Sequence, residues 1–356
     1  MFKIAVNRIH FQVDTVNQLF YNTRNGLQSK STVKEMSAVR TNKKRNYAKG
    51  LDLLRGIAII GIVLYHLFPS VFEGGFLGVP LFFVLSGYLM FVTSDIRFQK
   101  GKFSIGKYYK KRILKIFPAL FTMVMVVCCY LTLFCRSRLI GIQGEIASIF
   151  FGYNNWWQIG QNASYFSKMG DASLFTHLWF LAVELQFYLI WPVLFFLYQK
   201  GCQIAGTKAM SFFFPVLAFL SAGWMFFLYT PGSDPSRVYY GTDTMAFPLL
   251  IGISAGALKK QGTTFFLGKQ KETSLAVLSI LATCFLFFIV NGKNRRIYQG
   301  GMFVISLFFA GMVCLFESHK KILEKLPGAS LLSRIGQKSY YIYLWHYPLI
   351  ILAQTI

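Results

Sequence analysis

The sequence is poor in charge, and in acidic residues above all. Only 13 of its 356 residues are Asp or Glu, and all charged residues together make up 14% of the chain. A soluble domain carries roughly a quarter. Hydrophobic residues reach 54%, and the mean hydropathy is +0.47. Because a soluble globule needs more charged residues on its surface, the composition predicts a polytopic membrane protein.

Paired cysteines and a leader-like segment are also missing. The six cysteines form no CxxC, and Cys128, Cys129, Cys284 and Cys314 lie inside apolar runs, as small core residues do. We therefore predict neither a disulfide framework nor a metal site. Residues 1–50 are polar and basic and show no apolar segment followed by a small-residue cleavage site. We expect them to form a disordered cytoplasmic tail and not a cleaved signal peptide.

The net charge of +24 raises the question of nucleic acid binding. The 37 basic residues, however, stand in short clusters between apolar runs. That distribution is typical of membrane topology and not of a basic reading face. We therefore expect the lipid bilayer, and no nucleic acid, as a partner.

Nine apolar stretches are long enough, or nearly so, to cross a bilayer as helices, which takes about 20 residues each. We predict an all-α, multi-pass bundle of about nine to ten transmembrane helices in a transmembrane domain over residues 51–356. The nine stretches are 53–71, 76–94, 113–134, 178–198, 212–229, 244–258, 274–290, 299–316 and 339–356.

Lys and Arg set the orientation of such a bundle, because they accumulate on the cytoplasmic side. With the N-terminus in the cytoplasm, 30 of the 37 basic residues fall on the cytoplasmic side and seven on the other. This asymmetry predicts a cell-membrane protein with a cytoplasmic N-terminus. The longest outer loop, 135–177, carries Trp156 and Trp157, which either anchor the chain at the interface or stack on a sugar ring.

Ionisable side chains inside apolar spans are candidates for function, because they are costly in lipid. In "LDLLRGIAIIGIVLYHLF", Arg55 and His66 are eleven residues apart, almost three helical turns, and so share one face. At 1.5 Å per residue they are roughly 16 Å apart along the axis. Arg55 then lies at the cytoplasmic rim and His66 deeper. A snorkelling arginine and a hydrogen-bonded core histidine remain the alternative.

Glu184 is the acidic residue that lies clearly inside a span, in "HLWFLAVELQFYLIWP". It follows His177 by two turns, at a depth compatible with that of His66. A carboxylate beside an imidazole would orient the ring and stabilise its protonated form. The alternative is a structural glutamate bonded to a neighbouring helix.

Two further features stand near the cytoplasmic side. The cluster "KYYKKRILKIFP" contains Lys111, Arg112 and Lys115 at a helix entrance. It serves either as a membrane anchor or as a binding site for a phosphorylated cosubstrate. Ser86, in "VLSGYLM", is expected to bond its own helix or a neighbour, since a role as nucleophile requires an adjacent base that the sequence does not reveal.

Six stretches in series resemble the acyltransferase-3 family of integral membrane O-acyltransferases. They span about residues 51–350 and read "LRGIAIIGIVLYH", "GGFLGVPLFFVLSGYLM", "KRILKIFPAL", "HLWFLAVELQFYLIWP", "YYGTDTMAFPLLIG" and "SYYIYLWHYP". The stretch "HLWFLAVELQFYLIWP" and the loop "NNWWQIGQNASYF" are most similar to the branch that O-acetylates peptidoglycan in Gram-positive bacteria.

This resemblance implies an enzyme that uses cytoplasmic acetyl-CoA and passes the acetyl group to a hydroxyl of an extracytoplasmic glycan. Arg55, His66 and Glu184 match the family's functional positions, and Arg112 matches its cytoplasmic arginine. We expect Arg55, Arg112, Lys111 and Lys115 to bind the phosphates of CoA, His66 to act as general base or acyl carrier, and Glu184 to orient it.

Three departures from the family pattern stand out. Met245 and Lys115 occupy positions where the family has arginine, and a lysine lacks the bidentate fork. The chain ends at Ile356, where the family continues with a further helix and, in the peptidoglycan branch, a soluble domain. We therefore expect a truncation, a fragment or one half of a two-gene system that works with a separate extracytoplasmic transferase. A transporter or scaffold without chemistry and an inactive relative are the alternatives.

Overall fold

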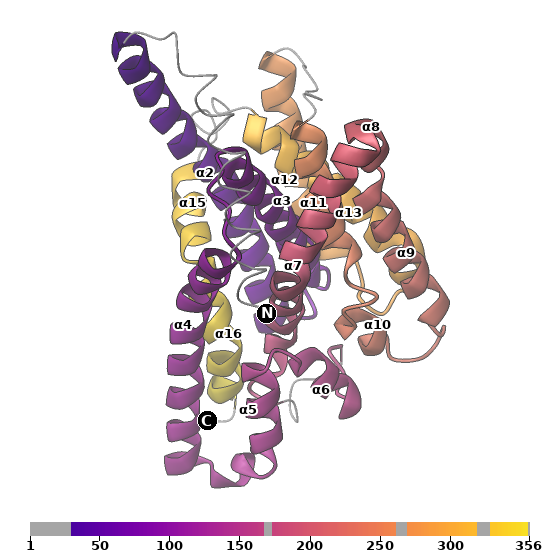
Figure 1. The fold of residues 1–356 in the computed structure, drawn as a ribbon. Helices are drawn as coiled ribbons and strands as arrows, with labels where there is room; N and C mark the ends of the chain where they lie inside the picture. Colours follow the sequence, from indigo (N-terminus) through magenta and orange to yellow (C-terminus); the bar gives the residue numbers. More distant parts are fainter. Residues whose placement is uncertain (1–29, 167–172, 261–268, 319–327, 355–356) are drawn as a thin grey trace.

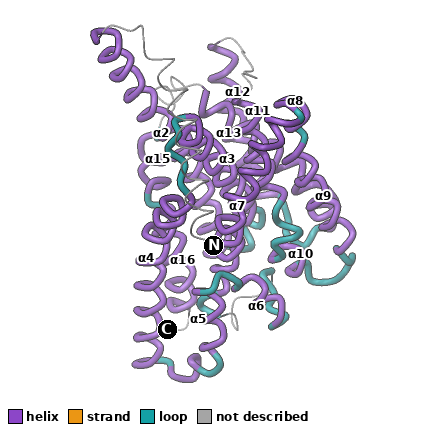
Figure 2. Tube along the Cα trace, in the orientation of Figure 1, coloured by secondary structure: helices purple, strands orange, loops and turns teal. Residues whose placement is uncertain are grey.

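The computed structural model describes residues 30–166, 173–260, 269–318 and 328–354. Residues 1–29 of the predicted tail lie outside this part, and from Lys30 the chain belongs to the first helix. Within the described residues the regular elements are helices, joined by short loops, and no strand occurs among them (Figure 2). The predicted all-α fold is therefore confirmed.

Seven helices of the described chain are long and apolar enough to cross a membrane. They account for seven of the nine predicted spans. The helices that carry these spans are α2 (Lys30–Leu67), α3 (Gly78–Gln99), α4 (Ile105–Phe134), α7 (Trp179–Ile204), α9 (Phe213–Leu228), α12 (Lys269–Ile289) and α13 (Met302–Ser318).

The remaining two predicted spans are shorter helices. The 14 residues of α11 (Phe247–Lys260) and the 16 residues of α16 (Ser339–Gln354) would each extend roughly 21–24 Å at 1.5 Å per residue. In α11, 11 of the 14 residues are buried, and the helix lies near the middle of the bundle (Figure 1). In α16, eight of the 16 residues are buried. In the described part of the chain, the nine predicted spans therefore correspond to seven helices of spanning length and two shorter ones.

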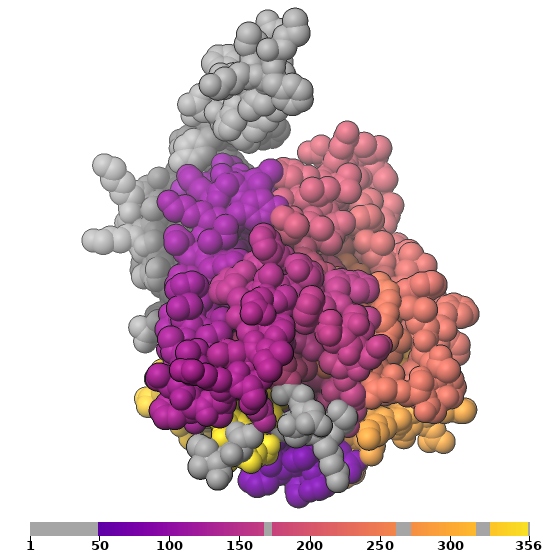
Figure 3. All heavy atoms as spheres, turned by 90° about the horizontal axis from the view of Figure 1, so that it is seen from below, coloured from indigo at the N-terminus to yellow at the C-terminus, as the bar shows by residue number. Residues whose placement is uncertain are grey.

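Short helices complete the fold at the ends of the bundle. They are η1 (Gly75–Leu77), η2 (Arg136–Leu139), α5 (Ile142–Phe150), α6 (Asn154–Gly160), η4 (Thr176–Leu178), α8 (Gly206–Met210), α10 (Ser236–Tyr240), η5 (Ile297–Gly301) and α15 (Ala329–Gln337). Viewed from below, the magenta atoms of the segment that follows α4 cover the middle of one end of the molecule, beside the yellow C-terminal residues (Figure 3).

Large apolar side chains remain exposed on the outer helices, among them Leu133, Phe219, Phe227 and Phe285. In water such a surface would be costly, but in a bilayer it needs no cover. The inner helices show the opposite pattern. In the most apolar 18-residue stretch of the span that contains α3, 78% is buried, compared with 22% in the span that contains α9. Lipid-facing helices therefore surround a packed interior.

The helices that carry the candidate site pack closely because glycine removes side chains at their crossings. A Cβ on Gly87 of α3 would meet the backbone carbonyl of Leu249 on α11, and one on Gly252 would meet that of Val84. At the other edge, a Cβ on Gly336 of α15 would meet the carbonyl of Asp52 on α2. Small residues that allow backbones to touch are the usual device for membrane helices.

Candidate functional site

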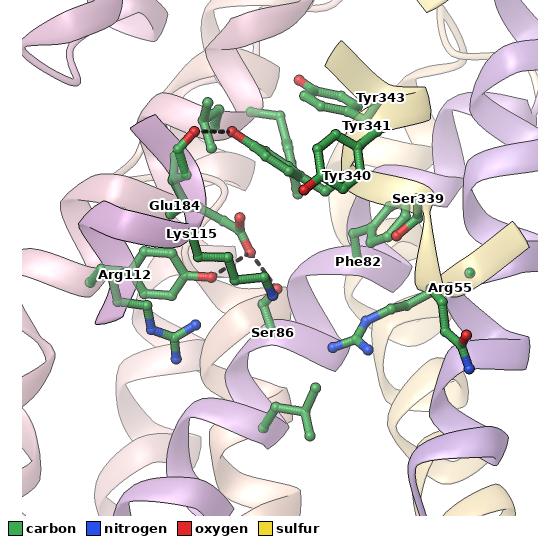
Figure 4. Close-up of a pocket in the computed structure, with 17 residues that line it drawn as sticks. Arg55, Phe82, Ser86, Arg112, Lys115, Glu184, Ser339, Tyr340, Tyr341 and Tyr343 are labelled. Carbon is green, nitrogen blue, oxygen red and sulfur yellow. Dashed lines mark hydrogen bonds between the residues drawn. The ribbon is translucent and has the colours of Figure 1, made fainter. Parts of the chain in front are cut away.

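A cavity of about 180 Å³ lies between α2, α3, α4, α7, α15 and α16. We call it the cationic pocket, because three of its side chains are basic: Arg55, Arg112 and Lys115. Figure 4 shows Arg112 and Arg55 reaching in from opposite sides, with Lys115, Ser86 and Glu184 between them. The pocket thus collects four of the six residues proposed from the sequence, each from a different helix except Arg112 and Lys115.

The three cations are held differently. Arg55 Nη1 lies 2.8 Å from Asp52 Oδ1, one turn earlier on α2. Arg112 instead places its guanidinium over the ring of Tyr188, with 4.2 Å between Cζ and the ring centroid, a cation–π contact. In the part of the chain that the structure describes, neither Arg112 nor Lys115 forms an ion pair within 4.0 Å. Their charges are therefore available to an anionic ligand.

Glu184 lies on α7 and faces this pocket. Its Oε1 accepts hydrogen bonds from the hydroxyl of Ser86 on α3 and, at 3.2 Å, from the hydroxyl of Tyr188 one turn along α7. Ser86 therefore bonds a neighbouring helix and not its own carbonyl. The bond also ties α3 to α7 beside the basic groups, so Glu184 offsets part of the positive charge.

A second, more open hollow adjoins the pocket at the start of α4. It is lined by Lys107, Lys110, Lys111, Leu114 and Lys115. Ser104 caps this helix, and its side chain accepts the backbone N–H of Lys107. Lys111 thus lines this outer hollow and not the cationic pocket, and Lys115 lines both. We call Lys107, Lys110, Lys111 and Lys115 the basic rim.

His66 lies elsewhere, at the far end of α2, in a cluster of three buried histidines with His177 and His346. Their side chains are 4%, 3% and 6% exposed. The ring centroid of His346 is 5.4 Å from that of His66 and 5.5 Å from that of His177. The ring of Tyr347 packs against both of the other histidines, at 4.9 and 5.1 Å.

Glu184 and His66 therefore belong to different clusters, although the sequence predicted that they pair. The hydrogen bonds found for Glu184 come from Ser86 and Tyr188, whereas His66 packs against His346, Tyr347 and Tyr165. The reason is tertiary: α3 and not α2 supplies the polar group that faces Glu184. Equal depth along two spans does not bring two side chains onto facing surfaces.

Tyr343 connects the two clusters. It lines the cationic pocket, and its ring lies 5.4 Å from that of His177 and 5.7 Å from that of His346. Its hydroxyl donates to the backbone carbonyl of His177. Tyr343 of α16 therefore contacts both the pocket and the histidine cluster.

A third polar group lies on α10 and the loop that follows it. Arg237 makes two hydrogen bonds to Asp243, at 2.9 and 3.2 Å, and lies over Trp156, 5.2 Å from that ring. Burial acts to raise the pKa of Asp243, but the bonds and charge of Arg237 outweigh it and leave the pKa below its usual value. Arg237 is thus the cation that contacts Trp156. Met245, where the family has arginine, is fully buried.

No site residue was predicted on α16, although the pattern of its sequence is informative. Ser339, Tyr340, Tyr343, His346 and Tyr347 recur at helical spacing in an otherwise apolar stretch. The structure places the first three of them on the cationic pocket and the last two beside His66. A polar stripe along a buried helix was the signal that could have found them.

The seven apolar helices, the cationic pocket and the buried histidines define a multi-pass membrane protein with a polar interior. Residues 48–356 match the family model described as an acyltransferase domain, so the chain belongs to that family and the predicted resemblance is confirmed. No solved structure gives a significant match.

Curated relatives extend this result. The chain is 37% identical over 323 residues to "Peptidoglycan O-acetyltransferase OatA" of Listeria monocytogenes, covering 89% of this chain and 51% of that protein. It is 37% identical over 320 residues to "Putative peptidoglycan O-acetyltransferase YrhL" of Bacillus subtilis, covering 87% and 50%. A "Putative O-acetyltransferase" of Staphylococcus aureus is 34% identical over 315 residues, covering 86% and 51%. The chain thus spans about half the length of these relatives.

Proposed function

We propose that this protein transfers an acetyl group from cytoplasmic acetyl-CoA to a hydroxyl of a cell-surface glycan, with peptidoglycan as the favoured acceptor. The observation that carries the proposal is the cationic pocket next to the basic rim, on a chain that belongs to an acyltransferase family. The printed names of two relatives, which refer to peptidoglycan, support the choice of acceptor.

The donor fits this arrangement by charge and size. CoA carries phosphates at one end and an uncharged thioester arm at the other. A cavity of about 180 Å³ suits the arm and not the nucleotide, which we assign to the basic rim outside it. Arg112 and Arg55 would hold a phosphate at the mouth of the pocket, because guanidinium groups bind phosphate through two N–H donors at once.

The acetyl end of the donor would then point toward Tyr343 and the histidine cluster. There we assign His66 as the general base that takes the proton of the acceptor hydroxyl while the hydroxyl oxygen attacks the thioester carbonyl. The carbon–sulfur bond breaks, and the sulfur of CoA leaves as a thiolate. A positioned base contributes about 10²–10⁴-fold to such a step. The surrounding apolar side chains exclude water, which limits hydrolysis of the thioester.

The proposed direction of transfer rests on the distribution of basic residues, which favours a cytoplasmic N-terminus and basic rim. The acceptor would approach from the opposite face, where α5 and α6 lie. We also propose that the bundle works with an extracytoplasmic transferase domain or protein, since the relatives are about twice as long as the part that matches this chain.

The test uses membrane vesicles that contain the full chain and radiolabelled acetyl-CoA, from cells that lack their own glycan O-acetyltransferases. Two readouts are followed: release of the CoA thiol and ester-linked label on glycan. We expect both to require access of acetyl-CoA to the cytoplasmic face and to fall about 10²-fold or more in His66→Gln. Lys102→Ala, which removes an exposed cation near α4 without touching the pocket, is the control and should keep full activity.

If vesicles with the chain release no more CoA than vesicles without it, the proposed enzyme activity is wrong. If label reaches the glycan equally well in wild type and His66→Gln, the role of His66 is wrong while the activity stands. Mass spectrometry of wall and membrane glycans from a deletion strain then identifies the acceptor by the missing ester.

A further inference from the structure

Asp52 is a buried acidic residue near the start of the α2 span, and the proposed reaction does not use its carboxylate. The residue is 7% exposed and stands one turn before Arg55. Its Oδ1 accepts a hydrogen bond from Arg55 Nη1 at 2.8 Å, and its Oδ2 accepts one from Gln337 Nε2 of α15 at 3.2 Å. Both carboxylate oxygens are therefore bonded to side chains that line the cationic pocket.

The backbone around Asp52 is held in place by α15. A Cβ on Gly336 would collide with the carbonyl oxygen of Asp52, so the two helices touch at this residue. One turn earlier on α2, the carbonyl of Lys49 accepts a hydrogen bond from Ser333 Oγ at 3.1 Å. Asp52 therefore lies at a close contact between two helices, which limits the movement of its carboxylate.

Arg55 needs an anchor because other orientations are open to it. Of its side chain 29% is exposed, so the guanidinium has water within reach. Arg112 and Lys115 line the same pocket, and their like charges oppose a third cation there. Asp52 is the one ion-pair partner of Arg55 among the described residues. The guanidinium nevertheless points into the pocket, toward Ser86 (Figure 4).

We propose that Asp52 is a positioning residue that holds Arg55 in the orientation in which it binds a phosphate of the donor. The ion pair uses Nη1, and a guanidinium has further N–H donors in a fixed fork, which remain for the phosphate. Asp52 acts through Arg55 and not by contact with the donor. The identity of the ligand rests on the proposed function.

The direction of the effect separates positioning from simple electrostatics. A carboxylate near a phosphate site repels the phosphate, so the loss of its charge alone would tighten the binding of an anionic ligand. The loss of a positioning residue weakens binding, because Arg55 is then free to leave the pocket. Asp52→Asn keeps the size and a hydrogen-bond acceptor but removes the charge. Asp52→Ala removes both the acceptor and the charge.

Asp95 on α3 offers a matched control outside the cationic pocket. Its Oδ1 lies 2.8 Å from Lys260 Nζ, and its Oδ2 accepts a hydrogen bond from Gln99. The side chains of Asp52 and Asp95 are both 9% exposed, and those of their cationic partners are 29% and 25% exposed. Asp95→Asn therefore weakens an ion pair of the same length and burial without changing the pocket.

The experiment measures the Kd of CoA and the KM of acetyl-CoA with the full chain in vesicles. We expect Asp52→Asn to raise both constants roughly threefold to tenfold, and Asp52→Ala to raise them further, with kcat changed less than about twofold. Asp95→Asn should change either constant less than about twofold. In protein that carries Arg55→Gln, Asp52→Ala should have little further effect, because the group that it positions is gone.

An unchanged or lower Kd of CoA in the Asp52 variants would overturn the positioning role and leave the proposed acetyl transfer in place. An equal rise in Asp95→Asn would overturn it as well, because that result indicates a general loss of structure. So would an equal rise from Asp52→Ala with and without Arg55. Where Asp52→Ala folds poorly, Asp52→Asn takes its place in the same comparison.

The wild type separates this inference from the proposed function. If it binds CoA and the Asp52 variants weaken binding as expected, but no CoA thiol is released from acetyl-CoA, the proposed enzyme activity is wrong and the positioning role stands. If the wild type binds no CoA, the proposed donor and the positioning role are both wrong.

Discussion

The hydroxyl of Ser86 on α3 donates a hydrogen bond to the carboxylate of Glu184 on α7, 98 residues later in the chain. Both side chains line the cationic pocket, and Glu184 is 9% exposed. The bond supplies Glu184 with a hydrogen-bond partner from another helix. It also gives Ser86 the adjacent carboxylate that the sequence did not reveal.

We predict that Ser86 and Glu184 contribute to stability as a coupled pair. A double-mutant cycle with Ser86→Ala and Glu184→Gln should give a coupling free energy of about 1–2 kcal/mol, because one partner of the pair is charged and buried. Unfolding titrations in mixed micelles measure it. Ser254→Ala is the control: its hydroxyl bonds its own helix carbonyl at Leu250, so its loss should cost less. A coupling energy near zero contradicts the prediction.

Arg112 should be sensitive to a conservative change. Lysine keeps the charge but loses the planar fork and the contact with the Tyr188 ring. If the pocket binds a phosphate of the donor, Arg112→Lys should raise KM for acetyl-CoA by roughly tenfold with a smaller effect on kcat. Initial rates over a range of acetyl-CoA measure this, with Lys102→Ala alongside. An unchanged KM for Arg112→Lys removes Arg112 from the donor site.

Gly336 should tolerate no side chain, because a Cβ there would collide with the backbone of Asp52. Gly336→Ala must push α15 away from α2 at the edge of the cationic pocket. We expect a loss of about 1–3 kcal/mol in the free energy of unfolding, together with weaker donor binding. Gly311→Ala on α13, with nothing within 4 Å of the new methyl group, should be neutral or gain about 0.5–1 kcal/mol. Similar losses at both positions would show that the close packing of α15 against α2 at Gly336 is not the cause.

The pair Arg237–Asp243 should make stability depend on pH in the acid range. The pKa of Asp243 in the folded state lies below its usual value of 3.8. Its contribution is therefore fully present above pH 3.8 and is lost as pH falls through the lower, folded-state value. Thermal unfolding of wild type and Asp243→Asn should differ at near-neutral pH and converge in acid. Arg237→Gln should abolish most of the difference, whereas a constant difference at all pH values would exclude the pair.

Much of the fold and part of the site could be predicted from the sequence. The apolar lengths located the seven helices that are long enough to cross a membrane and the shorter helices α11 and α16. The eleven-residue spacing identified Arg55 and His66 on α2, and the structure places Arg55 in the cationic pocket and His66 beside His346. The basic cluster in the first turns of α4 predicted the basic groups Arg112 and Lys115. These inferences succeeded because periodicity and length are properties of a single helix.

The predicted pairing of Glu184 with His66 was wrong, because it depends on how two helices face each other. Helical spacing gives the depth and face of a side chain but not the helix that faces it. Glu184 and His66 have compatible depths, yet α3 presents Ser86 to Glu184, while α16 presents His346 to His66. The prediction for Lys111 failed in a smaller way. Lys111 lines only the hollow of the basic rim, whereas Lys115, one turn later on α4, also lines the cationic pocket.

The sequence alone determined that this chain is a membrane bundle of the acyltransferase family with ionisable residues inside it, because composition, span length and motif order are local in the chain. Only the tertiary structure decided that these residues form two clusters, one of cations around Glu184 and one of histidines around His66, with Tyr343 between them. The physical reason is that contacts between helices depend on crossing points, which glycines such as Gly87 and Gly336 allow but do not specify by spacing.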